Sequence, residues 1–293
     1  MAKTTPDVYQ YTSLPDSLRV QIVHILRDAI GEWEHFLDST VNLRYRVLHQ
    51  LIAREHGVFE LTPNAANDAI SIFNFVLNEK DVAKVLDIPE ITFRSSEELA
   101  RRNQYPGQTL RDIGEVIDEF NERCRRAEVG YEYRSGCIIR VDSEYVHQEA
   151  IKPALAILSE SEFAGANQEF LRAHEHFRHG RYKESMNEAL KAFESTIKTI
   201  ASKRKWSLPK TPTARALIDA CFSNQLLDPM LMSYLSGVRT SLESGLPTVR
   251  NQAAGHGQGE APIAVPDYLA AFAINQAAVS IVMLATAHKQ RPK

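Results

Sequence analysis

Residues 182–205 have the sequence YKESMNEALKAFESTIKTIASKRK and carry a long helical pattern. Their apolar residues recur at steps of three and four, at Met186, Ala189, Leu190, Phe193, Ile197 and Ile200. This spacing places the six side chains on one face of an α-helix, because the helix turns once every 3.6 residues. We therefore expect a long helix here with one buried face.

Further helical patterns lie on both sides of this helix in the sequence. We expect helices over Ala166–His179, which stops at Gly180, over a segment with Thr211 as its cap and Pro212 at its first position, over about Pro229–Leu242, and over Pro266–His288. Together these segments predict a helical bundle.

The last of these helices is apolar on nearly every side and is long enough to span a membrane. Asn275, Gln276 and Ser280 lie near its middle, and alanine is abundant in it. Polar residues at that depth are costly in lipid. We therefore interpret the helix as a bundle core or an oligomer interface, and we expect no membrane contact.

The N-terminal half is also mainly helical, with one β-hairpin. The pattern predicts a brief helix and a loop over Val82–Phe93, because Pro89 interrupts it. Tyr131–Arg134 and Cys137–Val141 flank Ser135-Gly136 and predict the hairpin. Longer helices are expected over Leu18–Leu37, over Val41–Arg54 and over Asn64 to about Leu77. In the last of these, Ile70, Phe73 and Leu77 lie on one stripe. A further helix is expected from a capping box at Thr109 and Asp112 to about Glu128.

A stretch of small residues, Ser159–Gly165, separates the two halves. We expect a mainly α protein of two domains. Residues 1–160 would form an N-terminal helical domain with a small β-hairpin and a sensory or regulatory role. Residues 161–293 would form a C-terminal helical bundle.

The composition is that of an ordinary globular protein, with 44% hydrophobic and 24% charged residues. The net charge of −3 excludes a generally basic nucleic-acid binder, so an RNA site would have to be a local patch. Cys124, Cys137 and Cys221 are scattered, which indicates a reducing compartment and no structural zinc. The first residues, MAKTTPD, contain no apolar signal region, and we expect a cytoplasmic protein.

The segment 250–256, RNQAAGH, combines two side chains that could cut RNA without a metal. The guanidinium of Arg250 is permanently charged and forked, which suits a phosphate oxygen. The imidazole of His256 can exchange a proton near neutral pH. In such a reaction the ribose 2′-hydroxyl attacks its own phosphate, the imidazole assists proton transfer, and the cation stabilises the charged phosphorane.

This spacing, an Arg, a polar residue and a His after four to six intervening positions, resembles the ribonuclease motif of HEPN domains. The helices before it, with Ala-Phe-Glu-Ser at 192–195, resemble the abortive-infection subgroup over about the last 130 residues. The N-terminal half looks like the partner domain found with some of these proteins. The resemblance implies an antiviral abortive-infection effector or toxin with Arg250, Asn251 and His256 as catalytic residues, and with no cofactor or metal.

Two plainer interpretations stay open. His256 lies between Gly255 and Gly257, so the segment could be a helix end with a solvated Arg250 and a glycine C-cap. The domain could also be a non-catalytic HEPN-like module that binds RNA, a nucleotide or a protein.

Arg250 and His256 are six positions apart, which on a straight helix separates them by about 120° and about 9 Å along the axis. Either the segment bends at Gly255, or two copies bring their motifs to one cleft. HEPN proteins are typically dimers of the second kind, so the resemblance implies a homodimer through the C-terminal domain. We expect RNA, with tRNA as one candidate, as substrate, and a phage or host regulatory partner at the N-terminal domain.

Charged side chains on the helix over 182–205 are weaker candidates. Glu194 and Lys198 are one helical turn apart. They could form a surface ion pair, or Glu194 could orient Arg250 or His256. The basic run at the helix end could contact RNA, or could complement the helix dipole. It comprises Lys203, Arg204 and Lys205, ahead of Trp206.

Two further groups of histidines lie in the two halves of the chain. His174, His176 and His179 form a His-x-His-x-x-His pattern, but only the last two share a helix face. We interpret the group as a solvated face bordering the active site, and a metal-dependent hydrolase stays a third possibility. The histidines of the N-terminal half are interpreted as isolated packing or surface residues: His24, His35, His49 and His56.

Overall fold

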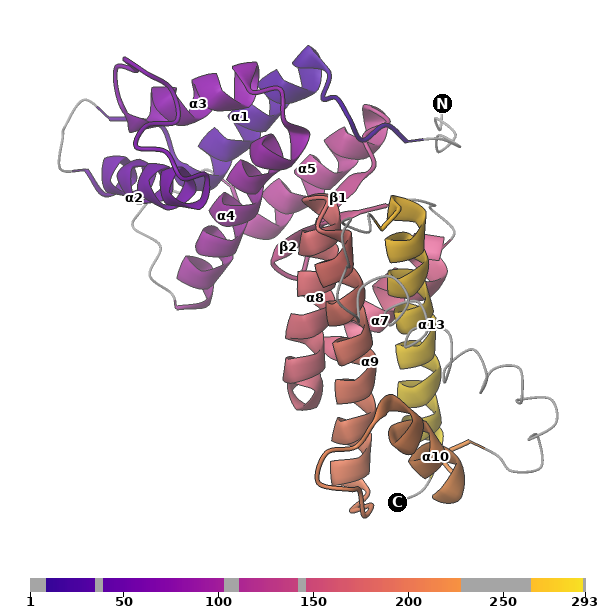
Figure 1. The fold of residues 1–293 in the computed structure, drawn as a ribbon. Helices are drawn as coiled ribbons and strands as arrows, with labels where there is room; N and C mark the ends of the chain where they lie inside the picture. Colours follow the sequence, from indigo (N-terminus) through magenta and orange to yellow (C-terminus); the bar gives the residue numbers. More distant parts are fainter. Residues whose placement is uncertain (1–8, 35–38, 103–110, 142–145, 228–264, 292–293) are drawn as a thin grey trace, which may run out of the picture. The chain divides into compact units, whose positions relative to one another are not determined.

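The computed structural model describes residues 9–34, 39–102, 111–141, 146–227 and 265–291. The chain divides into two compact units, residues 1–142 and 143–293. Both units are mainly helical, and the sheet in the described residues is a two-stranded antiparallel hairpin (Figure 1). The predicted fold class, mainly α with a small hairpin, is confirmed.

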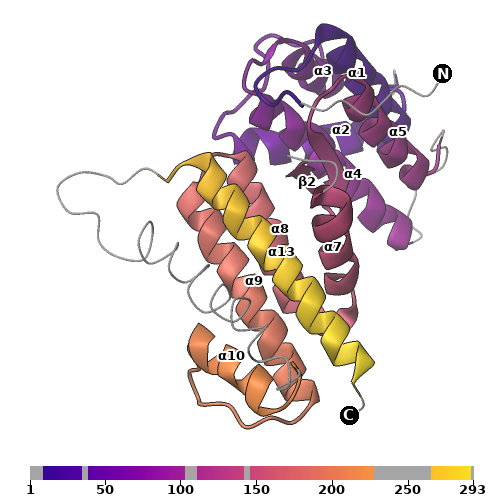
Figure 2. The ribbon, with the colours of Figure 1, turned by 90° about the vertical axis from the view of Figure 1, so that its right-hand side faces the viewer.

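The first unit is built around helix α1 (Asp16–Ile30), which contacts each of the other helices of the unit (Figures 1 and 2). Leu18, Ile22 and Leu26 of α1 are completely buried in the common core. The other helices are α2 (Thr40–Glu55), α3 (Asp68–Asn78), α4 (Val82–Arg101) and α5 (Ile113–Arg126).

Helix α1 ends earlier than its apolar pattern predicted. It stops at Ile30, and Gly31 follows with φ 110. This backbone conformation favours glycine. A Cβ at Gly31 would also lie 3.1 Å from a methyl group of Val41, so the chain turns here and the predicted extension to Leu37 is wrong.

Helix α4 is longer than predicted, because it continues through Pro89 to Arg101. A proline inside a helix removes the hydrogen bond to the fourth preceding carbonyl and costs about 3 kcal/mol. Leu86 and Ile88 before the proline and Phe93 after it are completely buried. Each such side chain contributes about 1.5–3 kcal/mol by burial. Packing on both sides therefore outweighs the cost of the proline, and the predicted loop is wrong.

The predicted stripe of α3 is also wrong at its ends. Ile70 and Leu77 are 39% and 38% exposed, whereas Ala69, Ile72 and Val76 form the buried face. Hydrophobicity alone did not separate these two faces, because both carry apolar residues. Contacts with α1, α2 and α4 select the Ala69 face.

The start of α5 is fixed by Asp112, whose carboxylate accepts hydrogen bonds from the backbone N–H groups of Gly114 and Glu115. A carboxylate at this position satisfies helix N–H groups that lack a partner within the helix. Thr109, the other half of the predicted capping box, lies outside the described residues.

The predicted hairpin is confirmed as β1 (Tyr131–Arg134) and β2 (Cys137–Arg140), with Tyr131 opposite Arg140. Ser135 and Gly136 both have positive φ, as a two-residue hairpin turn requires. The carboxylate of Glu90 on α4 accepts the backbone N–H of Ile138 at 2.7 Å. This buried bond attaches the hairpin to α4.

In the second unit, four helices lie side by side (Figures 1 and 2). They are α7 (Lys152–Leu158), which follows a π-helical turn (His147–Ile151), α8 (Ala164–Arg178), α9 (Tyr182–Lys203) and α13 (Asp267–Gln290). The six apolar residues predicted to form one face of α9 are all buried. The long helix with one buried face is therefore confirmed.

Helices α8 and α9 are joined at Gly180, which has φ 70. The Ser185 hydroxyl of α9 donates to the carbonyl of Ala173 on α8 at 2.8 Å, inside the core. The predicted domain boundary at 160/161 lies in this second unit, beside a short 3₁₀ turn (Ser161–Phe163) between α7 and α8.

Helix α13 is the helix in the described residues that is long and apolar enough to cross a membrane, and half of its most apolar window is buried. Its buried side includes Ala273, Ala277 and Ile281, and it packs on α7, α8 and α9. Tyr268 and Val279 are 66% and 54% exposed on the other side. Burial among three helices is what a bundle core requires.

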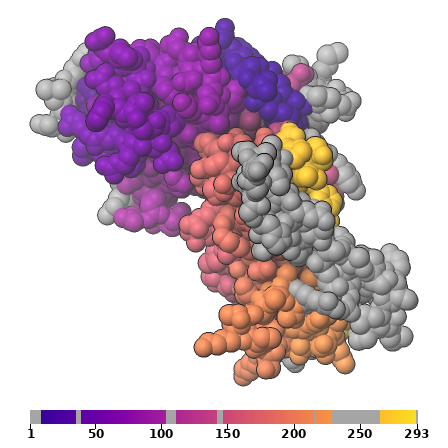
Figure 3. Space-filling view, viewed as in Figure 1, coloured from indigo at the N-terminus to yellow at the C-terminus, as the bar shows by residue number. Residues whose placement is uncertain are grey.

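A short helix, α10 (Ala214–Ser223), packs on α9 and forms surface at one end of the second unit (orange in Figure 3). Its cap is Thr213, whose hydroxyl accepts the N–H of Ala216 at 3.2 Å. The predicted cap Thr211 and the predicted first helical position Pro212 are therefore wrong, because both residues precede the cap Thr213. The helix predicted over Pro229–Leu242 lies outside the described residues.

Candidate active site

The three predicted catalytic residues, Arg250, Asn251 and His256, lie outside the described residues. The structure describes the two points at which their segment joins the bundle. Gln225 accepts a hydrogen bond from the Arg291 guanidinium at the C-terminal end of α13, and Val265 precedes the N-terminal end of the same helix. These points are separated by the length of a 24-residue helix, about 36 Å.

Glu194 and Lys198 form the i,i+4 pair that their spacing predicted. The Lys198 Nζ lies 3.8 Å from Glu194 Oε2, and the two side chains are 46% and 20% exposed. A pair of this kind contributes a few tenths of a kcal/mol, about 0.3–0.5. The partial burial of Glu194 on α9 is compatible with a role in orienting a catalytic group, and that role stays a prediction.

The basic run at the end of α9 has a structural task in the bundle. The Arg204 guanidinium donates to Nδ1 of His288 at 2.8 Å and to the carbonyls of His288 and Arg291 at 2.7 and 2.9 Å. Carbonyls in the last turn of a helix have no partner within the helix, so a cation there is favourable. Arg204 thus joins the C-terminal ends of α9 and α13.

The two lysines beside Arg204 differ from it. The Lys203 Nζ lies 3.2 Å from Glu162 Oε2. Lys205 follows the end of α9, where it is exposed and has a φ of 57. Contact of these three cations with RNA stays a prediction, for which Lys203 and Lys205 offer exposed side chains.

The His174 group does not form one solvated face. His174 is 3% exposed and its ring packs edge-on against Phe170, with centroids 4.9 Å apart. Burial, with the charge of His147, lowers the pKa of His174 to about 3. The solvated interpretation is therefore wrong for His174. In the described ranges, no group of three or more His, Cys, Asp and Glu side chains could hold a metal ion.

The buried His174 predicts a pH dependence of stability. Its pKa is about 3 in the folded protein and 6.5 ordinarily, so the unfolded chain binds a proton between these values and the folded chain does not. The stabilisation is complete above pH 6.5 and falls by about 1.4 kcal/mol per pH unit below it. Between pH 7 and pH 5, the free energy of unfolding should therefore fall by about 2 kcal/mol less in His174→Leu than in the wild type.

Urea denaturation of the wild type and His174→Leu at pH 7, 6 and 5 measures this difference. His179→Gln, at the half-exposed C-cap of the same helix, is the matched control and should keep the wild-type dependence. Parallel pH dependences for the wild type and His174→Leu would show that His174 is not buried in its neutral form.

Two family models match the chain. A HEPN-like domain, Abi_C, matches residues 164–288, and AbiJ N-terminal domain 4 matches residues 1–156. The chain belongs to the Abi-type HEPN proteins. The HEPN-like match covers α8, α9 and α10 together with Arg250, Asn251 and His256. No curated protein and no solved structure matches the chain.

These domains indicate a role related to abortive infection for this Abi-type HEPN protein. The predicted boundary at 160/161 lies between the residues matched by the two models. The unit that carries the HEPN-like match is the one that contains α7, α8, α9 and α13.

Sequence reasoning missed the partners of two histidines in the AbiJ-type half of the protein. His56 Nε2 lies 3.0 Å from Asp87 Oδ2, and both side chains are nearly buried. His49 contacts Asp68 and Ser71. Neither histidine is isolated, because helices far apart in sequence bring these partners together. His24 is exposed, as expected, and His35 lies outside the described residues.

Proposed function

We propose that this protein is a metal-independent endoribonuclease that acts in abortive infection, with Arg250, Asn251 and His256 as its catalytic residues. The observation that supports this most is the HEPN-like match at residues 164–288, which encloses the Arg-Asn pair and the histidine at the ribonuclease spacing. The match and the motif together support the proposal more strongly than either does alone, since an Arg and a His at this spacing often arise by chance.

In the proposed reaction, the ribose 2′-oxygen attacks the adjacent phosphorus as its proton leaves to a base. The bond from phosphorus to the 5′-oxygen then breaks, and the leaving oxygen takes up a proton. His256 serves as the general base or acid in these transfers. Arg250 binds the scissile phosphate through two parallel hydrogen bonds, and Asn251 holds the site by hydrogen bonds. The products carry a 2′,3′-cyclic phosphate and a 5′-hydroxyl.

The active form is proposed to be a homodimer through the HEPN-like unit, with the two motifs lining one RNA groove. The proposal rests on the 120° separation of Arg250 and His256 expected on a straight helix. The exposed apolar side of α13, with Tyr268, Phe272 and Val279, is a surface of the kind that oligomers bury. The AbiJ-type half would sense a phage or host product, or restrain the nuclease, in the cytoplasm.

A second candidate is a non-catalytic HEPN-like module that binds RNA, a nucleotide or a protein. Two of the residues predicted to bind RNA already have partners within the protein, which favours this candidate. Arg204 hydrogen-bonds to the C-terminal end of α13, and Lys203 pairs with Glu162. A module of this kind keeps the fold and binds without cutting.

Purified full-length protein incubated with cellular RNA in excess EDTA separates the two functions. The ribonuclease is expected to cut in EDTA and to leave cyclic phosphate and 5′-hydroxyl ends, which end-specific ligation and sequencing detect. RNA binding with no cleavage, with or without Mg²⁺, would establish the non-catalytic module. Cleavage that EDTA abolishes would require a metal-dependent enzyme.

A further inference from the structure

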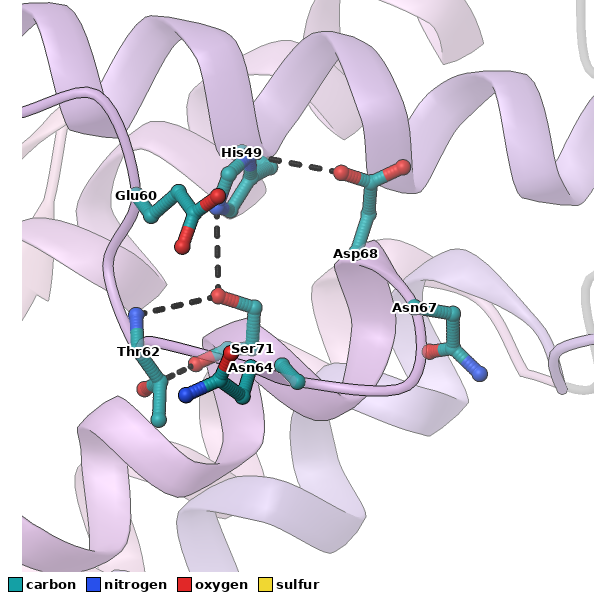
Figure 4. Close-up of a pocket in the computed structure, with 8 residues that line it drawn as sticks. His49, Glu60, Thr62, Asn64, Asn67, Asp68 and Ser71 are labelled. Carbon is teal, nitrogen blue, oxygen red and sulfur yellow. Dashed lines mark hydrogen bonds and ion pairs between the residues drawn. The ribbon is translucent and has the colours of Figure 1, made fainter.

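A polar pocket of about 240 Å³ lies between α2 and the start of α3 in the first unit (Figure 4). It is smaller than the roughly 300–1,000 Å³ of sites that hold drug-sized ligands, so it suits a small group. Seven polar side chains line it, together with Ala65. They are His49, Glu60, Thr62, Asn64, Asn67, Asp68 and Ser71.

Three of these side chains contact one another in the order carboxylate, imidazole and hydroxyl (Figure 4). Asp68 Oδ1 lies 3.3 Å from His49 Nδ1, and His49 Nε2 lies 3.1 Å from Ser71 Oγ. Asp68 and Ser71 are three residues apart on α3, so they share one side of that helix, and His49 faces them from α2.

The backbone defines which nitrogen of His49 carries the proton. The N–H of Leu61 donates to His49 Nε2 at 3.4 Å, so Nε2 accepts and Nδ1 holds the hydrogen that faces Asp68. With Nε2 as an acceptor, the Ser71 hydroxyl donates its hydrogen to it. This is the tautomer in which a histidine can remove a proton from a serine, and a carboxylate on the far nitrogen holds that tautomer.

We propose that the AbiJ-type half of this protein contains a second active site, in which Ser71 is an acyl-accepting nucleophile, His49 its general base and Asp68 the positioning residue. The proposal rests on the juxtaposition of the three groups at the wall of this pocket, where Ser71 is 4% exposed, and it is independent of the ribonuclease. The substrate class is a small ester or activated acyl compound that is neutral or positively charged.

The reaction balances with these groups and water alone. Ser71 Oγ forms a bond to the acyl carbon while its proton passes to His49 Nε2, and the alcohol leaves with that proton. Water then attacks the acyl-serine, again giving a proton to His49. The acid departs, and the proton returns to Ser71 Oγ. No step needs an oxidant, a metal or a second substrate besides water.

The pocket wall supplies donors and sets the charge preference. The backbone N–H of Thr62 donates to Ser71 Oγ itself at 3.1 Å, and it thereby lies beside the place where a carbonyl oxygen would gain negative charge. The amide of Asn64 lines the same pocket. Glu60 and Asp68 place two carboxylates there, which disfavour an anionic substrate.

A simpler interpretation is that these contacts have only a structural role and stabilise the loop before α3. The Thr62 hydroxyl also donates to the Ser71 carbonyl at 2.9 Å, so the network does position this loop. A purely structural role predicts an unreactive Ser71. A nucleophilic Ser71 predicts covalent reaction with electrophiles that trap serine hydrolases. One labelling measurement therefore distinguishes the two interpretations.

The measurement is labelling of the full-length protein with a neutral fluorophosphonate, in which Ser71 Oγ bonds to phosphorus and fluoride leaves. Mass spectrometry of peptides from the wild type is expected to find the adduct on Ser71. Ser71→Ala and His49→Gln should lower the labelling rate at least tenfold. Ser17→Ala and His24→Gln replace exposed residues of α1 in the same unit and should leave the rate unchanged.

The role of Asp68 needs a readout that loss of stability would not reproduce. Asp68→Asn should slow labelling, and Asp68→Glu should restore part of the rate, with the thermal midpoint of each variant measured alongside. For substrate charge, 4-nitrophenyl acetate should be cleaved faster than the anionic 4-nitrophenyl succinate, and Glu60→Gln should narrow that difference.

Absence of an adduct on Ser71 in folded wild type, or an adduct that forms equally fast in His49→Gln, would overturn the proposal. Because the adduct site is determined on the wild type, the first of these results does not depend on how well any variant folds. Labelling of Ser71 would stand whether or not RNA is cut, so the two proposals fail separately.

Discussion

His256→Ala is expected to lower the rate of RNA cleavage by about 10²–10⁴-fold, the usual contribution of a general acid or base. Arg250→Ala should lower it by about 10²–10³-fold, because the cation that offsets the charge on the phosphorane is lost. Arg250→Lys keeps the charge and loses the forked contact with phosphate, so it should lie between the wild type and Arg250→Ala. Single-turnover cleavage in EDTA gives these rates.

Combining the two substitutions tests whether the residues act together. If Arg250 and His256 serve one phosphate, the double variant should be little slower than the worse single variant. His24→Ala, which replaces an exposed histidine of α1 in the other unit, should cleave at the wild-type rate. A His256→Ala protein that cuts as fast as the wild type would exclude this histidine from the chemistry.

Phe193→Ala is expected to destabilise the HEPN-like unit by about 3–5 kcal/mol, because it removes a ring from a packed core and leaves a cavity. Phe193 is completely buried in the middle of α9, which contacts α8, α10 and α13. Most domains are stable by only about 5–15 kcal/mol, so the loss approaches the whole stability of the unit. Hydrogen–deuterium exchange should show lost protection in peptides of α8, α9 and α13.

Peptides of α1 to α5 should keep their protection in Phe193→Ala, since those helices have a core of their own. Ser202→Ala is the matched control, because Ser202 is an exposed residue of the same helix, and it should change stability by no more than about 0.5 kcal/mol. Equal exchange in Phe193→Ala and Ser202→Ala would mean that α9 is not the centre of this unit.

The helices with one clearly apolar face were predictable from the sequence. The face of α9 through Phe193 is an example, since its apolar residues recur at helical spacing and its opposite side is polar. The β1–β2 hairpin was predictable for a different reason, because Ser135-Gly136 supplies the positive φ angles that a two-residue turn needs.

Elements decided by tertiary packing were not predictable. Pro89 predicts a break in any isolated helix, and only the buried residues around it keep α4 continuous. In α3, Ile70 and Ile72 are equally apolar, so only the neighbouring helices determine which of them is buried.

The candidate sites divide in the same way. Arg250, Asn251 and His256 could be proposed because they are close in sequence, and the HEPN-like match encloses them. The contact of His49 with Ser71 joins residues 22 positions apart on two helices, and no local pattern marks it. His174 belongs to a conspicuous histidine pattern, yet its packing against Phe170 makes it a core residue.

Expression of the wild type beside His256→Ala in a bacterium, followed by sequencing of RNA ends, tests the ribonuclease most directly. We predict growth arrest by the wild type alone, with new 5′-hydroxyl and cyclic phosphate ends in RNA from those cells. Normal growth with no new ends in the wild type, or the same arrest and ends in His256→Ala, would contradict the account.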